Sequence, residues 1–347
     1  MRHLVLTAAA VVTGTAVPGC GDCSSSPVAS GASSTPVPLV VYSAQGYDSA
    51  MVKAFQKATG IPTKLTDDST GPLLARVQAE RANPQWGVLW VDGDEPFAVL
   101  DKQGMLVRQF QPQVTYNAAG QAVVPADKSY VPTGLTVTAA VVYDETKTPK
   151  PPTSWEELLS PAWKGAVGMN DPSVSGPTYP FVAGRFAGLG GISQGEGFFS
   201  ALRGNGLHVF KTNADSLHAL QTGQIKVALI QSSAGIAAGL RAPHIETTYL
   251  PKVTSLPSVI GINAKAPKQV QEEAKRFASF VLSAQGQQVM LTGDASGDSL
   301  YWPVVSGVRP NAGLRSLDSI PTQAIDPYTW GPQESAINSW FTNTIVH

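Results

Sequence analysis

The 347-residue chain contains 24 Lys and Arg residues against 25 Asp and Glu residues, which gives a net charge of −1 at pH 7. This balance argues against nucleic acid or an anionic membrane surface as an electrostatic partner. Charged residues make up 14% of the chain and apolar residues 43%, enough for a sizeable core in two domains or in two lobes of one domain.

The first 38 residues have the features of an export signal and a tether. Arg2 and His3 precede an apolar run at 4–17 that is too short to span a bilayer as a mature helix. "VPGC" at 17–20 resembles a bacterial lipoprotein cleavage site, so we expect 1–19 to be a signal peptide and Cys20 to be lipidated; cleavage elsewhere is the alternative. The Ser- and Pro-rich segment 20–38 has the composition of a flexible tether. We expect the protein in the periplasm or at the outer face of the cytoplasmic membrane, touching the membrane only through this anchor.

From residue 39 onward, short β-prone runs alternate with amphipathic helices. Strands are predicted at 39–43, 62–66 and 86–91, each followed by a helix. The first helix ends at Gly60, and the second begins at Pro72, after the polar stretch "DDSTG". Three such units in succession predict a parallel sheet covered by helices.

The same organisation returns in the second half of the chain. An extended run at 129–145 precedes strands at 165–169, 206–210 and 225–231, and a second extended run covers 247–263. This order predicts an α/β clamp of two lobes that hinges at crossings 131–136 and 248–256. The first lobe would contain 39–132 and about 250–300, and the second would contain 133–249 and the C-terminal helices to 347. In such sheets the ligand binds at the carboxyl ends of the strands, here in the cleft between the lobes.

The loops that follow these strands share one chemistry. Nearly all carry small hydroxyl, amide or Asp side chains ahead of a helix. One such loop is an ordinary helix cap, but six in equivalent places predict a ring of helix N-termini that suits an anion. The candidate ligand-binding residues are Ser43, Ala44, Gln45, Ser69, Thr70, Gly71, Asp92, Asp94, Ser173, Ser175, Gly176, Thr178, Asn213, Asp215, Ser232 and Ser233.

The segment "PPTSWEELLSPAWKGAVGMNDPSVSG" at 151–176 resembles a known family. It is similar to the solute-binding proteins of bacterial ABC importers, in the branch of ferric iron, 2-aminoethylphosphonate, sugar phosphate and thiamine binders. "LVVYSAQG", "PTGLTVTAAVVYDE" and "QGQQVML…LYWPVV" match the same branch in order. The resemblance implies a type II periplasmic-binding-protein fold, in which two α/β lobes joined by hinge strands close on a small molecule. It also implies delivery of that molecule to a permease in the cytoplasmic membrane.

The resemblance leaves the ligand open between two classes. The hydroxyl-rich helix openings are similar to those of organophosphonate and organophosphate binders. Ser173, Ser175, Gly176 and Thr178 would then hold the phosphonate oxygens with Ser69, Thr70 and Gly71 opposite, and Asp92 and Asp94 would pair with an ammonium group, as in 2-aminoethylphosphonate. Ferric iron is the alternative, but the adjacent tyrosines of iron binders are replaced at 231–233. The tyrosines that remain as lesser candidates are Tyr47, Tyr179, Tyr249 and Tyr301.

A secreted hydrolase is the alternative of another class. The chain has no G-x-S-x-G, H-E-x-x-H or G-x-x-x-x-G-K-[ST] motif, and its five histidines are scattered. Its two cysteines, Cys20 and Cys23, both precede the folded body. We therefore expect a monomeric binding protein that is not an enzyme and that uses no cofactor, no metal site and no nucleic-acid partner.

Overall fold

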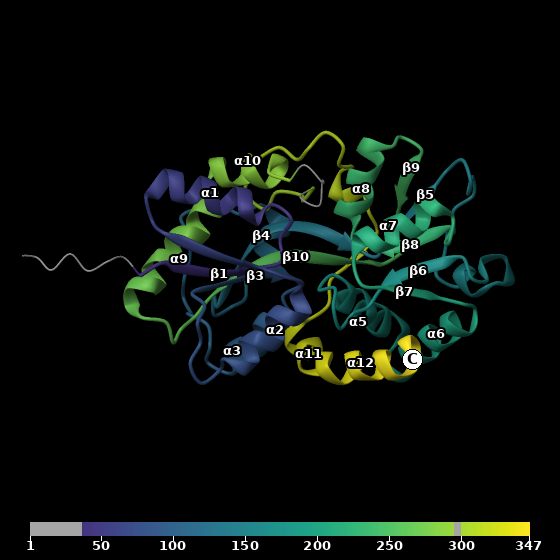
Figure 1. Cartoon of the computed structure of the whole chain (residues 1–347), viewed down its shortest axis with the longest axis horizontal. Helices are drawn as coiled ribbons and strands as arrows, with labels where there is room; N and C mark the ends of the chain where they lie inside the picture. Colours follow the sequence, from purple (N-terminus) through teal and green to yellow (C-terminus); the bar gives the residue numbers. More distant parts are fainter. Residues whose placement is uncertain (1–36, 295–299) are drawn as a thin grey trace, which may run out of the picture. The chain divides into compact units, whose positions relative to one another are not determined.

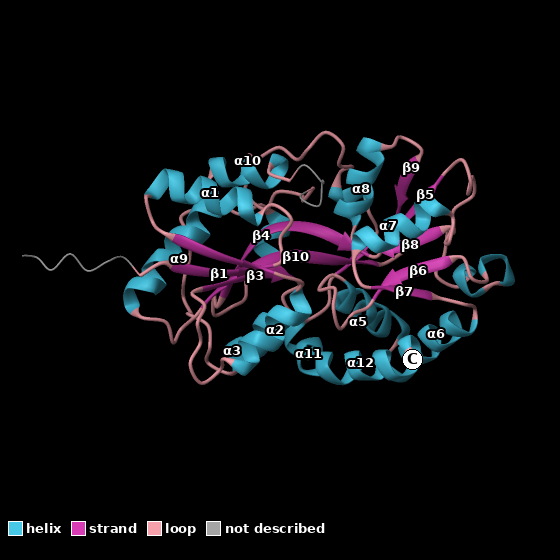
Figure 2. Cartoon of the chain, viewed as in Figure 1, coloured by secondary structure: helices cyan, strands magenta, loops and turns pink. Residues whose placement is uncertain are grey.

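The computed structural model describes residues 37–294 and 300–347. The predicted signal peptide, Cys20 and the tether up to residue 36 lie outside these residues. Within them the strands form two sheets, each with helices on both faces (Figures 1 and 2).

The first sheet is built from the beginning of the body and from strands that return later. Its order is β11-β10-β3-β1-β2, and β4 also pairs with β10. β1 is parallel to β2 and β3, whereas β10 is antiparallel to β3 and β4, so the sheet is mixed. We call the part of the body built on this sheet the first lobe. Its strands are β1 Leu39–Ser43, β2 Thr63–Asp67, β3 Val88–Asp92, β4 Tyr130–Thr138, β10 Val253–Ile262 and β11 Thr322–Gln323.

The second sheet, which defines the second lobe, has the order β7-β6-β8-β5-β9. β6 is parallel to β7 and β8, whereas β5 is antiparallel to β8 and β9. Apart from β10 and β11, which are also parallel, the parallel pairs come from strand–helix units. The antiparallel pairs involve the segments that connect the lobes. The strands are β5 Ala140–Asp144, β6 Val167–Asn170, β7 His208–Phe210, β8 Val227–Ile230 and β9 Ile245–Thr248.

Alternation along the strands explains why helices cover both faces of each sheet. In β1, Val41 belongs to the core cluster that contains Phe55 of α1, whereas Tyr42 belongs to the cluster that contains Leu73 of α2. Successive strand residues point to opposite faces, so both faces of the sheet are apolar and both need cover. The helices of the first lobe are α1 Asp48–Thr59, α2 Thr70–Ala79, α3 Glu95–Lys102, α4 Ala118–Val123, α9 Lys268–Val281 and α10 Ala284–Thr292.

The second lobe follows the same rule. In β5, Val141 shares a core cluster with Phe186 of α5, and Val142 shares another with Leu220 of α7. The helices of this lobe are α5 Thr178–Leu189, α6 Ile192–Gly204, α7 Asn213–Thr222 and α8 Ser232–Arg241. The Val141 cluster also contains Phe55 of the first lobe, so one apolar core runs through both lobes.

Three connections join the lobes. The chain passes from β4 to β5 at 138–140 and from β9 to β10 at 249–252. The third connection is the C-terminal strap, residues 327–347, which contains α11 Pro327–Trp330 and α12 Glu334–Phe341. Lys102 of α3 donates a hydrogen bond to Tyr328 O at 2.9 Å, while the Trp340 ring lies 5.9 Å from that of Phe186 in α5.

The strand pairing bears on the predicted crossings. β4 stays paired with β10 up to Thr138, beyond the expected crossing at 131–136, and the second crossing lies within the expected 248–256. The C-terminal helices, expected on the second lobe, begin on α3 of the first. We propose lobe limits at 138–140, 249–252 and the strap in place of the limits expected from sequence.

Most of the elements expected from the sequence are confirmed. α1 ends at Gly60, whose φ of 69° suits glycine and whose N–H donates to Gln56 O at 2.9 Å. α2, however, begins at Thr70 rather than at Pro72. None of the helices in 37–294 and 300–347 combines the length and the apolar character that crossing a membrane requires.

Candidate functional site

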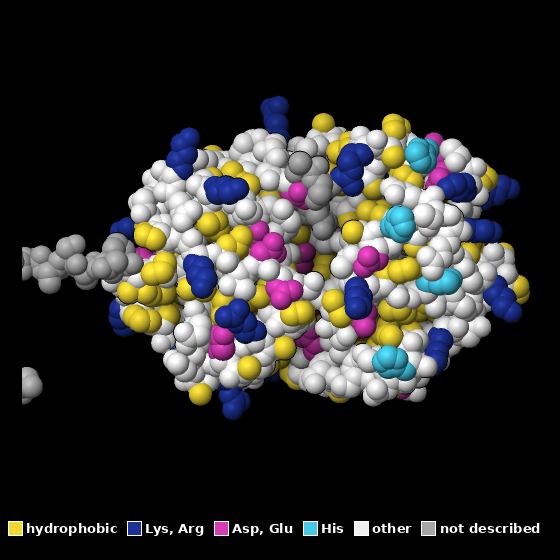
Figure 3. Space-filling view, viewed as in Figure 1, with side chains coloured by type: hydrophobic (Ala, Val, Ile, Leu, Met, Phe, Trp, Pro, Cys, Tyr) yellow, Lys and Arg dark blue, Asp and Glu magenta, His cyan; other side chains and the backbone are white. Residues whose placement is uncertain are grey.

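A cavity of about 550 Å³ lies between the lobes, and we call it the cleft cavity. It lies where the carboxyl ends of β1, β2 and β7 meet the N-termini of helices, and Figure 3 shows the body hollowed between the lobes. Of the residues predicted from sequence, seven line this cavity. They are Ala44, Gln45, Ser69, Thr70, Ser175, Gly176 and Asn213.

The second-lobe wall of the cleft cavity is rich in hydrogen-bond donors. Asn213 and Ala214 are the first two residues of α7, and their N–H groups have no intrahelical acceptor. Within the described residues the Gly176 N–H makes no hydrogen bond either. Lys211 lines the same wall, is exposed and forms no ion pair in this part of the chain. This wall can therefore bind an anionic group.

The first-lobe wall has the opposite character. Asp48, Asp67 and Asp68 line it, together with Gln45. Burial raises the pKa of the Asp48 carboxyl to about 6; Ser43 opposes the rise by hydrogen bonding, and the charge of Asp67 adds to it. Burial also raises the pKa of Asp67. The cleft cavity thus has donors on one wall and carboxylates on the other.

A buried network lies behind the first-lobe wall. Gln45 Nε2 donates to Asp92 Oδ1 at 3.0 Å, and Gln231 Nε2 donates to Asp92 Oδ2 at 3.0 Å. Tyr301 OH donates to the same Oδ2 at 2.8 Å. Gln231 follows β8 of the second lobe, so the Asp92 carboxylate at the end of β3 joins the two lobes. Asp92 is 5% exposed and does not line the cleft cavity, where the sequence had placed it as a partner for an ammonium group.

The lobes touch directly at one side of the cleft cavity. Gly71 N–H, at the start of α2, donates to Val174 O at 3.2 Å. A methyl group built at Gly71 would lie 2.1 Å from Ser173 O, and one built at Gly176 would lie 2.3 Å from Thr70 Oγ1. These glycines permit a backbone approach that a larger residue would prevent.

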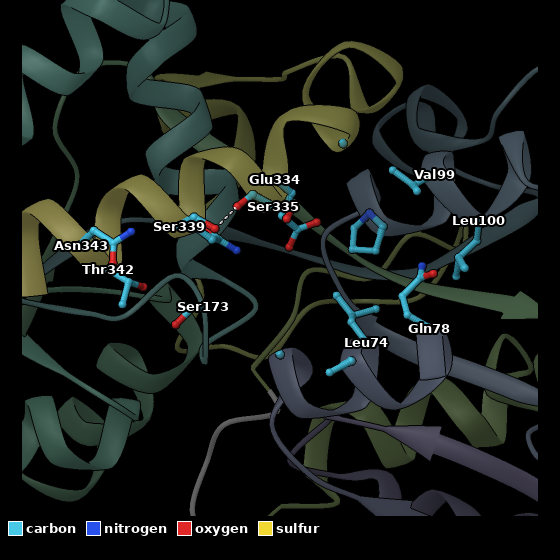
Figure 4. A pocket seen from close by; sticks show the side chains of 15 residues that line it. Leu74, Gln78, Val99, Leu100, Ser173, Glu334, Ser335, Ser339, Thr342 and Asn343 are labelled. Carbon is cyan, nitrogen blue, oxygen red and sulfur yellow. Dashed lines mark hydrogen bonds between the residues drawn. The ribbon is translucent and has the colours of Figure 1, made fainter. Parts of the chain in front are cut away.

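That contact separates the cleft cavity from a second cavity of about 680 Å³ between α2, α3 and α12 (Figure 4). Gly71 and Ser173 line the second cavity, not the cleft cavity. Leu74 and Val99 project from one side and Glu334, Ser335 and Asn343 from the strap. The structure therefore divides the predicted ring of loops between two cavities.

Several other candidates have structural roles. Asp215 forms a capping box with Thr212 at the start of α7. Ser232 Oγ lies 2.7 Å from Thr136 Oγ1, which ties α8 to β4. Three further candidates are buried: Ser43, Thr178 and Ser233. Asp94 lines a third cavity of about 750 Å³, and burial raises its pKa to about 7.

The tyrosines do not converge on the cleft cavity. Tyr179 OH donates to Trp330 O of the strap, and Tyr249 lines a further cavity beside α8. Tyr47 is fully buried, with its ring 5.1 Å from that of Trp90 and 5.8 Å from that of Tyr301. Burial and, secondly, the Asp92 charge raise the pKa of Tyr47 well above its usual value, which disfavours a phenolate. Among the described residues, no group of three or more His, Cys, Asp and Glu side chains is arranged to hold a metal ion.

The residues of this region that were not predicted from the sequence include Asp48, Asp67, Lys211 and Gln231. An acid in the first turn of a helix, such as Asp48, occurs commonly for electrostatic reasons alone, so its position carries no signal of binding. Thr212 and Asp215, by contrast, have the three-residue spacing of a capping box, which was readable in "TNAD".

Comparisons with known proteins identify the family of the chain. Residues 50–320 match the family described as bacterial extracellular solute-binding protein. Over 266 residues the chain is 24% identical to a Salmonella paratyphi A protein named "Putative 2-aminoethylphosphonate-binding periplasmic protein", and the match covers 74% of each chain.

Solved structures share the fold. Iron-bound HitA from Pseudomonas aeruginosa matches with a TM-score of 0.74 and 20% identity over 88% of this chain and 99% of its own. AfuA from Actinobacillus pleuropneumoniae, with fructose-6-phosphate bound, matches with a TM-score of 0.77 and 18% identity over 89% and 98%. At these identities the likeness concerns the fold, which is that of type II periplasmic binding proteins.

Proposed function

The chain belongs to the bacterial extracellular solute-binding proteins, and from that premise we propose that its cleft cavity captures a small organophosphonate or organophosphate. The protein is the solute-binding component of an ABC importer, and the permease of that importer is its partner. We propose that it binds without breaking bonds. Cys20 lipidation remains a prediction, which mass spectrometry of the mature N-terminus tests.

One observation supports an anionic ligand above the others: the donor-rich wall of the second lobe. The N–H groups of Gly176, Asn213 and Ala214, together with the Lys211 ammonium, line one side of a cavity of about 550 Å³. A tetrahedral oxyanion accepts hydrogen bonds from several directions, so such a wall satisfies its oxygens without a metal. The 2-aminoethylphosphonate name of the Salmonella relative supports the same ligand class. Ferric iron is disfavoured because none of the candidate tyrosines, Tyr47, Tyr179, Tyr249 and Tyr301, lines the cleft cavity.

The mechanism we propose is hinge closure. A solute held by both walls stabilises the state in which Gly71 meets Val174, because only that state lets both lobes contact it. The 138–140 and 249–252 crossings would bend, and the strap would follow.

A melting-temperature screen tests the ligand class. We expect stabilisation by 2-aminoethylphosphonate or ethylphosphonate and none by ferric citrate or thiamine. A ligand at 100 times its dissociation constant adds about 2.7 kcal/mol to the free energy of unfolding. Stabilisation by ferric citrate alone, or turnover of any phosphorus compound, would contradict the proposal.

Two hydroxyl deletions test the site. Ser175→Ala and Thr70→Ala each remove a hydroxyl at the cleft cavity, so we expect phosphonate affinity to fall by about 3- to 10-fold in calorimetry. The melting temperature of the unliganded protein should change little. Ser335→Ala, which removes a hydroxyl from the second cavity, is the matched control and should leave the affinity unchanged.

A further inference from the structure

Two acceptor atoms on the first-lobe wall of the cleft cavity have no hydrogen-bond partner among the described residues. They are Gln45 Oε1 and Asp48 Oδ2. Both side chains belong to residues that are only 2% exposed, and both residues line the cavity. An unsatisfied buried acceptor is destabilising, and more so when it is charged. Their presence in one wall therefore indicates that a donor completes the site.

The orientation of the Gln45 amide follows from its partner. Asp92 is a carboxylate and only accepts hydrogen bonds when ionised, and two other donors, Gln231 Nε2 and Tyr301 OH, already converge on it. The amide group of Gln45 must therefore present Nε2 to Asp92, as its 3.0 Å contact requires. Its carbonyl oxygen is left as an acceptor at the cavity wall.

Charge reinforces this preference for a donor. Asp48 carries a carboxylate beside Asp67, and Asp68 lines the same wall. Lys211 is the basic residue lining the cleft cavity, and it belongs to the opposite wall, in the segment before α7. Neither Asp48 nor Asp67 forms an ion pair within the described residues. A neutral donor would satisfy the two orphan acceptors, but a cationic one would also offset the three carboxylates.

We propose that Gln45 Oε1 and Asp48 Oδ2 form a subsite for a primary ammonium group of the solute, with Asp67 adding negative charge. The solute class is then a zwitterion whose anionic group binds the second lobe and whose ammonium binds the first. This inference rests on the proposed function and names the residues that distinguish a solute with an ammonium group from a solute without one. It also moves the ammonium partner from Asp92 and Asp94, as expected from sequence, to Asp48.

The test compares two ligands that differ by the amine. Calorimetry of the mature protein with 2-aminoethylphosphonate and with ethylphosphonate should show at least 10-fold tighter binding of the first. Asp48→Asn should weaken 2-aminoethylphosphonate binding by about 10- to 100-fold, the range for hydrogen bonds to a charged group, and should change ethylphosphonate binding by less than about 3-fold. Glu272→Gln is the matched control: it removes one carboxylate from α9, outside the cavity, and should affect neither ligand.

The pH dependence supplies a second readout. The ammonium group lowers the second pKa of the phosphonate in 2-aminoethylphosphonate relative to ethylphosphonate, so the ratio of the two affinities changes with pH for that reason as well. The difference in this change between the wild-type protein and Asp48→Asn reports on the amine subsite. We expect that ratio to fall between pH 7.5 and pH 5, because protonation of Asp48 removes its charge. Asp48→Asn should make this fall smaller, and an equal fall in both proteins would contradict the subsite.

Each outcome decides a different claim. Equal affinities for the two ligands, or an Asp48→Asn effect of the same size on both, would overturn the ammonium subsite and leave phosphonate binding intact. Failure of both ligands to bind would overturn the phosphonate part of the proposed function, and failure of phosphate esters as well would overturn all of it. If Asp48→Asn fails to fold, the ratio of the two affinities for the wild-type protein at constant pH still decides.

Discussion

Glu334 begins α12 and lines the second cavity beside Pro96. Burial raises the pKa of its carboxyl to about 7. Burial is the main cause that raises the pKa of Glu95, and the charges of Asp94 and, to a smaller extent, Glu334 add to it. Glu95 Oε2 has no hydrogen-bond partner in the described part of the chain. The strap therefore contacts the first lobe through carboxyls that favour the protonated state.

The sign of the resulting pH effect follows from the raised pKa. The unfolded carboxyl titrates near 4.5, so the native state holds the proton more tightly between about 4.5 and 7. The stability that protonation provides is complete below about 4.5 and is lost as the pH rises through 7. Glu334→Gln keeps the neutral form at every pH. We expect it to raise the free energy of unfolding at pH 8 by on the order of 1–3 kcal/mol, since the side chain is partly exposed, and by almost nothing at pH 4.

Urea unfolding at pH 4, 6 and 8 measures this difference. Asp318→Asn is the control, because Asp318 is an exposed acid of the first lobe. A gain from Glu334→Gln that is equal at pH 4 and pH 8 would show that packing, and not charge, is responsible.

At the residue scale, the sequence predicted which kinds of side chain gather at the cavity better than it predicted the role of each residue. Hydroxyl and amide residues ahead of helices do gather at the cleft cavity, as Ser69, Ser175 and Asn213 show. The sequence could not show which of Asp92 and Asp48 faces the cavity, because the two acids differ only in their surroundings. The Asp92 carboxylate is held in the interior by Gln45, Gln231 and Tyr301, which lie 47 to 209 residues away from it in the chain.

At the scale of elements, the start of α2 carries the contact between the lobes. The helix begins two residues before Pro72, and Thr70, 5% exposed, packs against Gly176 of the second lobe. Proline is tolerated in a first turn because the N–H groups there have no helical acceptor.

Gly71→Ala tests whether this contact belongs to the ligand-binding state. The added methyl would meet Ser173 O at 2.1 Å, so the lobes must separate or shift. Overpacking of this kind costs roughly 1–3 kcal/mol, which would weaken ligand binding by about 5- to 150-fold if the contact forms on closure. Titration calorimetry measures the affinity, and small-angle scattering measures the radius of gyration.

Gly197→Ala is the matched control, since it adds the same methyl group to α6 where nothing lies within 4 Å. Unchanged affinity in Gly71→Ala would mean that closure does not use this contact.

α6 itself was not expected from sequence, because three glycines lower its helix propensity. Buried Phe198 and Phe199 stabilise it instead.

At the scale of the whole body, three connections and one shared core join the lobes. Alternating strand and helix patterns were sufficient to predict two α/β lobes with two crossings, because those patterns are local. The strap was not predictable in the same way. Its place depends on contacts such as Trp340 with Phe186, 154 residues apart.

Phe341→Ala tests how far the strap contributes to stability. Phe341 is fully buried, and its ring lies 5.6 Å from that of Phe199 in α6. Its truncation should lower the free energy of unfolding by about 3–5 kcal/mol in urea titration, because it removes a large side chain from the core. Ser339→Ala, an exposed change in the same helix, should have little effect. A loss below about 1 kcal/mol would show that the strap is loosely held.

The Asp92 carboxylate has one more consequence, which concerns how selectivity changes over evolution. The Gln45 amide has a donor side, Nε2, and an acceptor side, Oε1. The Asp92 carboxylate, which does not line the cleft cavity, determines which of the two faces the cavity. A hydrogen-donating residue at position 92 would turn the amide over and show its hydrogens in place of its lone pairs. The residues that line the cavity would stay the same, but the wall would then prefer a hydrogen-bond acceptor, such as an anion, to a donor, such as an ammonium group. Related binding proteins with identical cavity linings therefore need not bind the same solute.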